Sequence, residues 1–214
     1  MFKTYAMLGL WTLLLWPQWS LAQATPARFT PFLPATETLQ QLNQGGFIFF
    51  LRHGPSDSSK PDQVPVDLTD CSTQRPLSDD GRIQMQQLGT QLPVLIPKIT
   101  QIFSSPLCRA TDTIQLVLPN HTYTIDDHLI YVAALTTEEK QPIIARTREL
   151  LSTPPQAGEN YLLVAHGPNL VEVMDYFPTE GALIIFKPSG QESGFEYLGT
   201  IELHDWSSLI STME

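Results

Sequence analysis

The chain has 214 residues, with 12 basic and 22 acidic side chains that give it a formal net charge of -10. Its long-range field repels nucleic acid and acidic membrane surfaces, and it weighs against either as a partner. The length suits one domain with a sizeable core. A site for an anionic ligand would have to be a local patch of positive charge.

The first 22 residues have the pattern of a secretory signal peptide. Lys3 supplies the positive start, Ala6 to Trp16 form an apolar core, and residues 20–24 offer small-x-small cleavage sites. The core is shorter than the roughly 20 apolar residues that span a bilayer, although an uncleaved anchor is the alternative. We expect a signal peptide at 1–22, a linker at 23–34 and a domain at 35–214. We also expect export to the periplasm or the extracellular space, without stable membrane insertion after cleavage.

An apolar run at residues 46–51 ends in Arg52, His53 and Gly54. Aromatic and β-branched residues bounded by glycines predict a strand that is buried on both faces, as in a parallel sheet covered by helices. In such sheets ligands bind at the carboxyl ends of the strands. Arg52 and His53 fall at that point.

Two later segments follow the same pattern. Residues 99–104 predict a strand that leads through Ser105 and Pro106 into a helix carrying Arg109, and the apolar run 161–165 ends in His166. Arginine binds phosphate through two parallel N–H groups. A neutral histidine can attack phosphorus and form a covalent intermediate. The histidines show no spacing typical of zinc, and the scheme needs neither a metal nor a cofactor.

The three segments together, Arg-His-Gly, Ser-Ser-Pro-x-x-Arg-Ala and Val-Ala-His-Gly, resemble the histidine phosphatase superfamily. The likeness is to branch 1, which includes phosphoglycerate mutases and small phosphatases, and it covers roughly residues 47–206. Residues 71–81 are similar to exported members, some of them related to lipopolysaccharide-core heptose phosphatases. The resemblance implies that His53 is the phosphorylated nucleophile and that Arg52, Arg109 and His166 complete the phosphate pocket.

The chain departs from the family pattern at the general acid. The family has a Glu in a Leu-x-Glu pattern where residues 129–131 read Leu-Ile-Tyr. A leaving alkoxide needs a proton from a positioned group. The candidates are Asp57, Asp127, Glu138 and Glu180. Asp127 is favoured because it lies nearest in sequence, although an Asp before a helix is also typical of a helix cap.

Further pocket residues are expected from the turns that follow the strands. Gly54, Ser56 and Asn169 follow signature turns and are predicted to line the phosphate site, and a carbonyl such as that of Gly54 could hold the imidazole of His53. Residues 55–76 have no apolar period and predict a long functional loop. Its Arg75 is either a surface charge or a further pocket cation.

The two cysteines, Cys71 and Cys108, flank segments that must meet at this pocket. Because export implies an oxidising compartment, we predict a disulfide between them, with two free thiols as the alternative. The crosslink would contribute about 3 to 4 kcal/mol in the chain-entropy account.

The remaining pattern predicts an α/β fold, with a three-layer α/β/α sandwich around a mostly parallel central sheet in a single domain. Helices are expected at 36–42, 78–92, 106–118 and 137–151, and further strands at 123–126, 182–187 and 196–203. The last two strands form an antiparallel pair across residues 188–190. The chain carries no internal repeat and no signal of an oligomeric state.

The sequence therefore predicts an exported phosphomonoesterase that hydrolyses a small phosphorylated substrate, such as a sugar phosphate, through a phosphohistidine. Two alternatives stay open. One is a catalytically weak pseudoenzyme of the envelope that binds phosphate, and the other is a phosphomutase.

Overall fold

The computed structural model describes residues 29–213. The predicted signal peptide at 1–22 and the first part of the predicted linker lie outside the described residues. The rest of that linker, residues 29–34, packs on the domain. The ring of Phe29 lies 4.8 Å from that of Tyr176, and the carbonyl of Phe32 accepts the backbone N–H of Thr200 at 2.8 Å. The folded unit therefore begins before residue 35, because the aromatic side chains in this proline-containing stretch find apolar partners.

Six strands form one mixed sheet in the order β3-β2-β4-β1-β5-β6. The strands are β1 (Ile48–Arg52), β2 (Ile99–Ser104), β3 (Thr124–Ile125), β4 (Asn160–Ala165), β5 (Leu183–Pro188) and β6 (Phe195–Ile201). The first four are parallel, β5 runs antiparallel to β1, and β6 runs antiparallel to β5. The predicted mostly parallel sheet and its antiparallel hairpin are confirmed.

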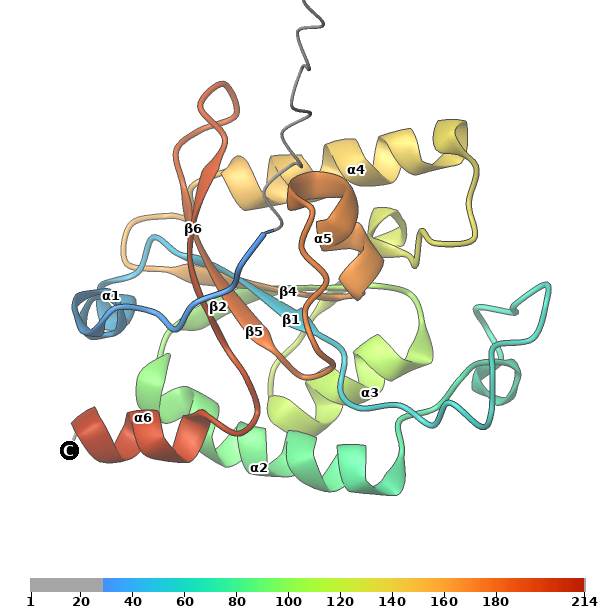
Figure 1. Cartoon of the computed structure of the whole chain (residues 1–214), viewed down its shortest axis with the longest axis horizontal. Coiled ribbons are helices and arrows are strands. Elements are labelled where there is room, and N and C mark those ends of the chain that lie inside the picture. The colour runs from blue at the N-terminus through green and yellow to red at the C-terminus, as the bar shows by residue number, and fades with distance from the viewer. Residues whose placement is uncertain (1–28, 214) are drawn as a thin grey trace, which may run out of the picture.

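Helices cover both faces of the sheet (Figure 1). One face carries α1 (Thr36–Gln41), α2 (Asp79–Leu95), α3 (Cys108–Val117) and α6 (Trp206–Met213), and the other carries α4 (Thr137–Ser152) and α5 (Gly167–Met174). Alternate residues of β1 serve the two cores. Phe49 and Leu51 pack toward α2 and α3, whereas Ile48 and Phe50 pack toward α4 and α5. The apolar run thus marks a strand that is buried on both faces, and the three-layer α/β/α architecture is confirmed.

Side-chain caps mark the starts of two helices. The hydroxyl of Ser78 accepts the N–H of Gly81 at the start of α2, and Thr136 forms a capping box with Glu139 at the start of α4. Helix α2 continues through Pro93 to Leu95, past the predicted end at residue 92. Helices α5 and α6 were not predicted.

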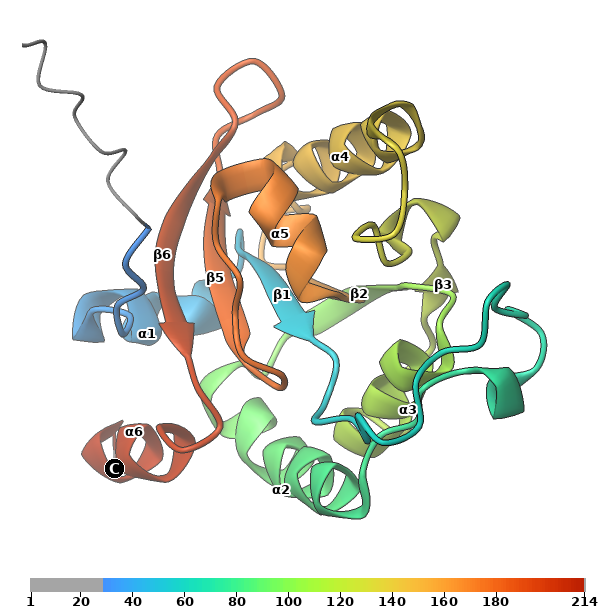
Figure 2. The ribbon, with the colours of Figure 1, turned by 45° about the vertical axis from the view of Figure 1, so that its right-hand side comes forward.

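A long loop, residues 53–78, joins β1 to α2 and contains a 3-10 helix at Cys71–Thr73. Figure 2 shows this loop extending outward from the end of β1 beside α3. In the described residues, no helix is both long enough and apolar enough to cross a bilayer.

Candidate active site

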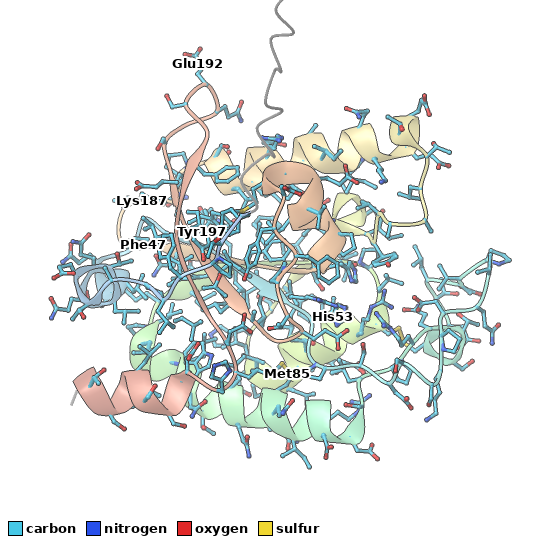
Figure 3. The ribbon with its side chains drawn as sticks, viewed as in Figure 1. Phe47, His53, Met85, Lys187, Glu192 and Tyr197 are labelled. Carbon is cyan, nitrogen blue, oxygen red and sulfur yellow. A yellow bond between two sulfur atoms is a disulfide. The ribbon has the colours of Figure 1, made fainter. Side chains whose placement is uncertain are left out.

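Three parallel strands end side by side at one edge of the sheet. The register pairs the last residue of β1 with the last residue of β4, and the last residue of β2 with the preceding residue of β4. His53, Ser105 and His166 are the residues that follow these three strands, and all three are buried. Figure 3 labels His53 at the end of β1, on the side of the molecule from which loop 53–78 extends. The sheet therefore brings together residues that lie more than a hundred positions apart in sequence.

The imidazole of His53 is held in one tautomer. Its side chain is 1% exposed, and its Nδ1 lies 2.9 Å from the carbonyl oxygen of Gly54. Because a carbonyl only accepts, Nδ1 carries the ring proton and Nε2 keeps its lone pair. Burial, followed by the charge of Arg109, lowers the pKa of His53 well below its usual value. The ring is therefore a neutral imidazole with one nitrogen free, which is the form of histidine that acts as a nucleophile.

The second imidazole faces the first. The ring centroids of His53 and His166 lie 5.2 Å apart, and Nε2 of His166 lies 2.7 Å from the hydroxyl of Ser105. That hydroxyl accepts the N–H of Leu107 and can donate its own proton to Nε2, which leaves Nδ1 as an N–H donor. Nδ1 is buried and has no protein partner. Burial and the nearby His53 lower the pKa of His166 well below its usual value, so this ring is also neutral.

Arg109 is fully buried beside these rings. Its Nη1 donates to Oδ1 of Asp62 at 3.0 Å, and its Nε and Nη2 are buried without a protein partner. Its guanidinium lies 5.7 Å from the ring centroid of Tyr131, and the Tyr131 ring stands at 88° to that of His166. Burial lowers the pKa of Arg109 and the carboxylate of Asp62 opposes this, but guanidinium stays charged in proteins.

The guanidinium of Arg52 is anchored by residues 177–180. Its Nη1 donates to the carbonyl of Pro178 at 2.5 Å, and its Nη2 donates to Oε1 of Glu180 at 3.2 Å. The guanidinium lies 4.6 Å from the ring centroid of Phe177. Its Nε is buried and has no protein partner. These contacts fix the plane of the guanidinium and leave Nε without a hydrogen bond.

A third arginine joins the cluster from loop 53–78. Nη2 of Arg75 lies 3.9 Å from Oε1 of Glu180, and its Nε is buried without a protein partner. Burial lowers the pKa of His53 most, and the charges of Arg109, Arg52 and Arg75 lower it further. Arg75 therefore lies beside Glu180 with its Nε buried, and its role as a further pocket cation stays a prediction.

The cluster leaves a set of buried N–H groups that point to an anion. Within residues 29–213, the donors without a partner are Nε of Arg52, Arg75 and Arg109, Nη2 of Arg109 and Nδ1 of His166. Buried donors are normally paired, because an unpaired one costs about 1–3 kcal/mol and more when it is charged. Three guanidinium groups against the two carboxylates that touch them leave the cluster with a net positive charge. The arrangement suits a phosphate dianion.

The other predicted pocket residues have structural partners. The N–H of Gly54 donates to Thr113 at 2.8 Å, and the N–H and hydroxyl of Ser56 both donate to Glu180. Asn169 is buried and donates to the carbonyl of Ile130 at 3.1 Å. Ser56 therefore holds Glu180 with both its N–H and its hydroxyl, whereas the Oδ1 of Asn169 is buried and has no partner among the described residues.

The structure does not bring Asp127 into the cluster. Its carboxylate is exposed on the 3-10 helix Asp127–Leu129 and contacts no pocket residue. The neighbouring Asp126 caps that helix and pairs with Arg146 at 2.7 Å. The segment reaches the pocket four residues later, at Tyr131. Nearness in sequence to the family's acid position was therefore a poor guide to position in space.

Of the other three predicted acids, Glu180 contacts the arginine cluster. Glu180 contacts Arg52, Ser56 and Arg75, whereas the carboxylate of Asp57 bonds to its sequence neighbours Ser59 and Lys60. Glu138 is exposed in the first turn of α4. Glu180 thus belongs to the site, with its oxygens occupied by three neighbours.

Sequence reasoning missed Asp62 altogether. This residue lies in the loop without periodicity, which contains several aspartates, and no local signal distinguishes it from the others. Tyr131 was noted only as the residue standing where a Glu was expected. That departure was the available signal for a side chain that contacts both Arg109 and His166.

A disulfide joins loop 53–78 to α3. Cys71 and Cys108 are bonded, with their Cα atoms 5.7 Å apart. The backbone N–H of Cys108 also donates to the side-chain oxygen of Gln74 at 2.7 Å. Because Arg109 follows Cys108 directly, both contacts tie the loop to the helix turn that carries a pocket arginine.

Residues 48–149 match the family model of the histidine phosphatase superfamily, branch 1. The match supports membership of this superfamily. It spans β1 to α4 and includes Arg52, His53 and Arg109. No curated protein matches the sequence.

Solved structures extend the likeness to the histidine phosphatase fold. The chain is similar to the protein histidine phosphatase SixA complexed with tungstate, at 15% identity and a TM-score of 0.53, with 74% of this chain and 98% of that chain covered. It is similar to the alpha-ribazole phosphatase of Shigella flexneri at 15% identity and a TM-score of 0.53, with 73% of this chain and 96% of that chain covered. It is also similar to a mycobacterial glucosyl-3-phosphoglycerate phosphatase in complex with VO3, at 18% identity and a TM-score of 0.53, with 72% of this chain and 97% of that chain covered. At these identities the likeness is one of fold.

Proposed function

We propose that this protein is a phosphomonoesterase that works through a phosphohistidine on His53. The observation that carries the proposal is one arrangement: a neutral, buried imidazole with Nε2 free stands among unpaired buried N–H groups of three arginines. Phosphoryl transfer passes through a loose transition state with charge on the equatorial oxygens, so that positioned cationic donors do most of the catalysis.

In the first step, Nε2 of His53 attacks phosphorus, the N–P bond forms and the ester P–O bond breaks. Arg52, Arg109 and Arg75 donate to the phosphoryl oxygens, and Nδ1–H of His166 supplies a neutral donor. Water then attacks the phosphohistidine, the N–P bond breaks and phosphate leaves. Gly54 keeps the His53 tautomer through both steps, since its carbonyl accepts from Nδ1 at 2.9 Å.

Ser56 and Asn169 act in this proposal as supports. Ser56 holds Glu180, which in turn orients Arg52 and approaches Arg75. Asp127 has no part in the proposed chemistry, because its exposed carboxylate contacts none of these groups.

The proposed substrate is a small phosphorylated compound, with a sugar phosphate of the cell envelope, such as a heptose phosphate, as the first class to test. The exposed ring of Phe177 beside Arg52 offers an apolar surface next to the phosphate for the leaving group. The similar fold of a glucosyl-3-phosphoglycerate phosphatase supports a sugar phosphate, and that of SixA suggests phosphohistidine as the competing class.

The proposed location is the periplasm or the extracellular space. The support is the signal-peptide pattern of residues 1–22 together with the disulfide between Cys71 and Cys108. Disulfides persist in oxidising compartments and are rare in the cytosol.

The test is release of inorganic phosphate by the protein from residue 23 onward, measured with 4-nitrophenyl phosphate and a panel of sugar phosphates. We expect His53→Ala to reduce the rate to background, while His204→Ala, at an exposed histidine, keeps it. Equal rates for the wild type and His53→Ala would refute the proposal. Transfer of phosphate to a second hydroxyl, without release, would show a phosphomutase instead.

A further inference from the structure

Asp62 is the acid of loop 53–78 that reaches the active site. Its Oδ1 accepts from Nη1 of Arg109 at 3.0 Å and from the backbone N–H of Arg75 at 2.7 Å. The other aspartates of this loop bond locally: Asp57 to Ser59 and Lys60, Asp67 to Thr69, and Asp70 to Ser72. Asp62 therefore lies against a phosphate-binding guanidinium, unlike its neighbours in the loop.

The second oxygen of Asp62 is free. Oδ2 has no protein partner in the described part of the chain, and the side chain is 30% exposed. The carboxylate of Glu180 is different, since Oε1 accepts from Arg52 and Ser56 and Oε2 accepts the N–H of Ser56. Both oxygens of Glu180 thus accept hydrogen bonds from the protein, whereas Asp62 has one oxygen available for a substrate.

Asp62 lies beside the guanidinium that would bind the phosphoryl group. Attacking and leaving atoms lie roughly in line in phosphoryl transfer. His53, at 1% exposed, forms the floor of the site, so the leaving oxygen points to the solvent side. Nε and Nη2 of Arg109 are the unpaired donors for phosphate, and Nη1 of the same guanidinium holds Asp62. A phosphate bound there has the carboxyl group of Asp62 at its side.

From this geometry we propose that Asp62 is the general acid of the reaction, an inference that rests on the proposed phosphohistidine chemistry. In this proposal Oδ2 of Asp62 carries the proton that is transferred, while Oδ1 keeps its contact with Arg109. As the ester P–O bond breaks, its electron pair goes to the leaving oxygen, which takes the proton from Oδ2. In the second step the Asp62 carboxylate removes a proton from the water that attacks phosphorus, and this restores the acid.

A leaving-group comparison tests the assignment. Values of kcat/KM are measured for 4-nitrophenyl phosphate, whose leaving group needs no proton, and for an alkyl ester such as glycerol 2-phosphate. The variants are Asp62→Asn and the matched control Asp70→Asn, which removes one charge from the same loop and can keep the hydrogen bond to Ser72. An Asn side chain at 62 can still accept from Arg109 and Arg75, so the fold of the loop is preserved.

We expect Asp62→Asn to lower kcat/KM for the alkyl ester by about 10²- to 10⁴-fold, the usual contribution of general acid catalysis. The aryl ester should change by only a few fold, and Asp70→Asn should change neither substrate.

Two outcomes would overturn the inference and leave the proposed function standing. Equal losses on both esters would show that Asp62 only positions Arg109. Equal gains on both would show that it blocks the site as an internal anion. If the wild type hydrolyses neither ester, the proposed function itself fails, and that result is distinct from both.

Discussion

Removing the disulfide between Cys71 and Cys108 should lower stability more than it disturbs the site. The two residues are 37 positions apart. In the chain-entropy account, releasing a loop of this length costs about 4 kcal/mol of unfolding free energy. For a domain of this size, that corresponds to a fall in Tm of roughly 8–16 °C.

The geometry of the active site should change less, because other contacts between loop 53–78 and α3 remain. The N–H of Cys108 donates to the side chain of Gln74 at 2.7 Å, and Nη1 of Arg109 still pairs with Asp62. We therefore expect the double variant Cys71→Ser/Cys108→Ser to keep a folded site at 25 °C, with a raised KM for 4-nitrophenyl phosphate.

The assay is thermal and urea unfolding followed by circular dichroism. Non-reduced mass spectrometry first establishes that the bond is present in the wild-type protein. Dithiothreitol should bring the wild type to the curve of the double variant and leave the double variant unchanged. A Tm difference below about 2 °C with the bond present would refute the chain-entropy reasoning.

Three further predictions follow from the buried groups. Arg109→Lys removes the unpaired Nε and Nη2 donors and should lower kcat/KM for 4-nitrophenyl phosphate by about 10²- to 10³-fold, the effect of losing one preorganised donor. Burial lowers the pKa values of His53 and His166 in the folded state. As the pH falls, these histidines therefore bind protons in the unfolded chain before they do so in the folded chain. The unfolding free energy should thus fall as pH drops below about 6.5, by up to about 1.4 kcal/mol per pH unit for each histidine. Gly81→Ala would drive its methyl group into the carbonyl oxygen of Pro55 and should lower the unfolding free energy by about 1–3 kcal/mol.

Matched controls accompany these three. Arg82→Lys, at a partly exposed arginine on α2, should keep full activity. His204→Gln, at an exposed histidine, should leave the pH slope unchanged, and Gln86→Ala, on the exposed face of α2, should leave Tm nearly unchanged. Full activity of Arg109→Lys would contradict the role of its unpaired donors. An unfolding free energy that stays constant from pH 7.5 to pH 5 would contradict the lowered pKa values of the two histidines. A wild-type Tm for Gly81→Ala would contradict the close contact with Pro55.

The sequence predicted the sheet and the residues at its edge because both depend on short-range patterns. The apolar run of β1 alternates between two cores, and register alone then places His53 beside His166. Arg109 followed from the turn after β2. Helix α5 was not predicted, since Gly167 and Pro168 read as a turn although proline is accepted in the first turn of a helix.

The carboxylates could not be predicted in the same way. Asp62 and Glu180 reach the arginines from loops, and loop conformation depends on contacts across the fold, here Asp62 with Arg109 and Glu180 with Arg52. Asp127 is the candidate nearest in sequence to the family's acid position, but its side chain is exposed to solvent. The departure at residue 131 pointed to the right place without identifying the group that acts there.

The most direct test of the account is to trap the covalent intermediate. The protein is mixed with radiolabelled substrate and quenched in base during turnover, and the labelled peptide is identified by mass spectrometry. The account predicts a base-stable, acid-labile phosphate on the peptide that contains His53, absent from His53→Ala and present in His204→Ala. Label retained by His53→Ala, or steady turnover of the wild type without any labelled protein, would contradict the central claim.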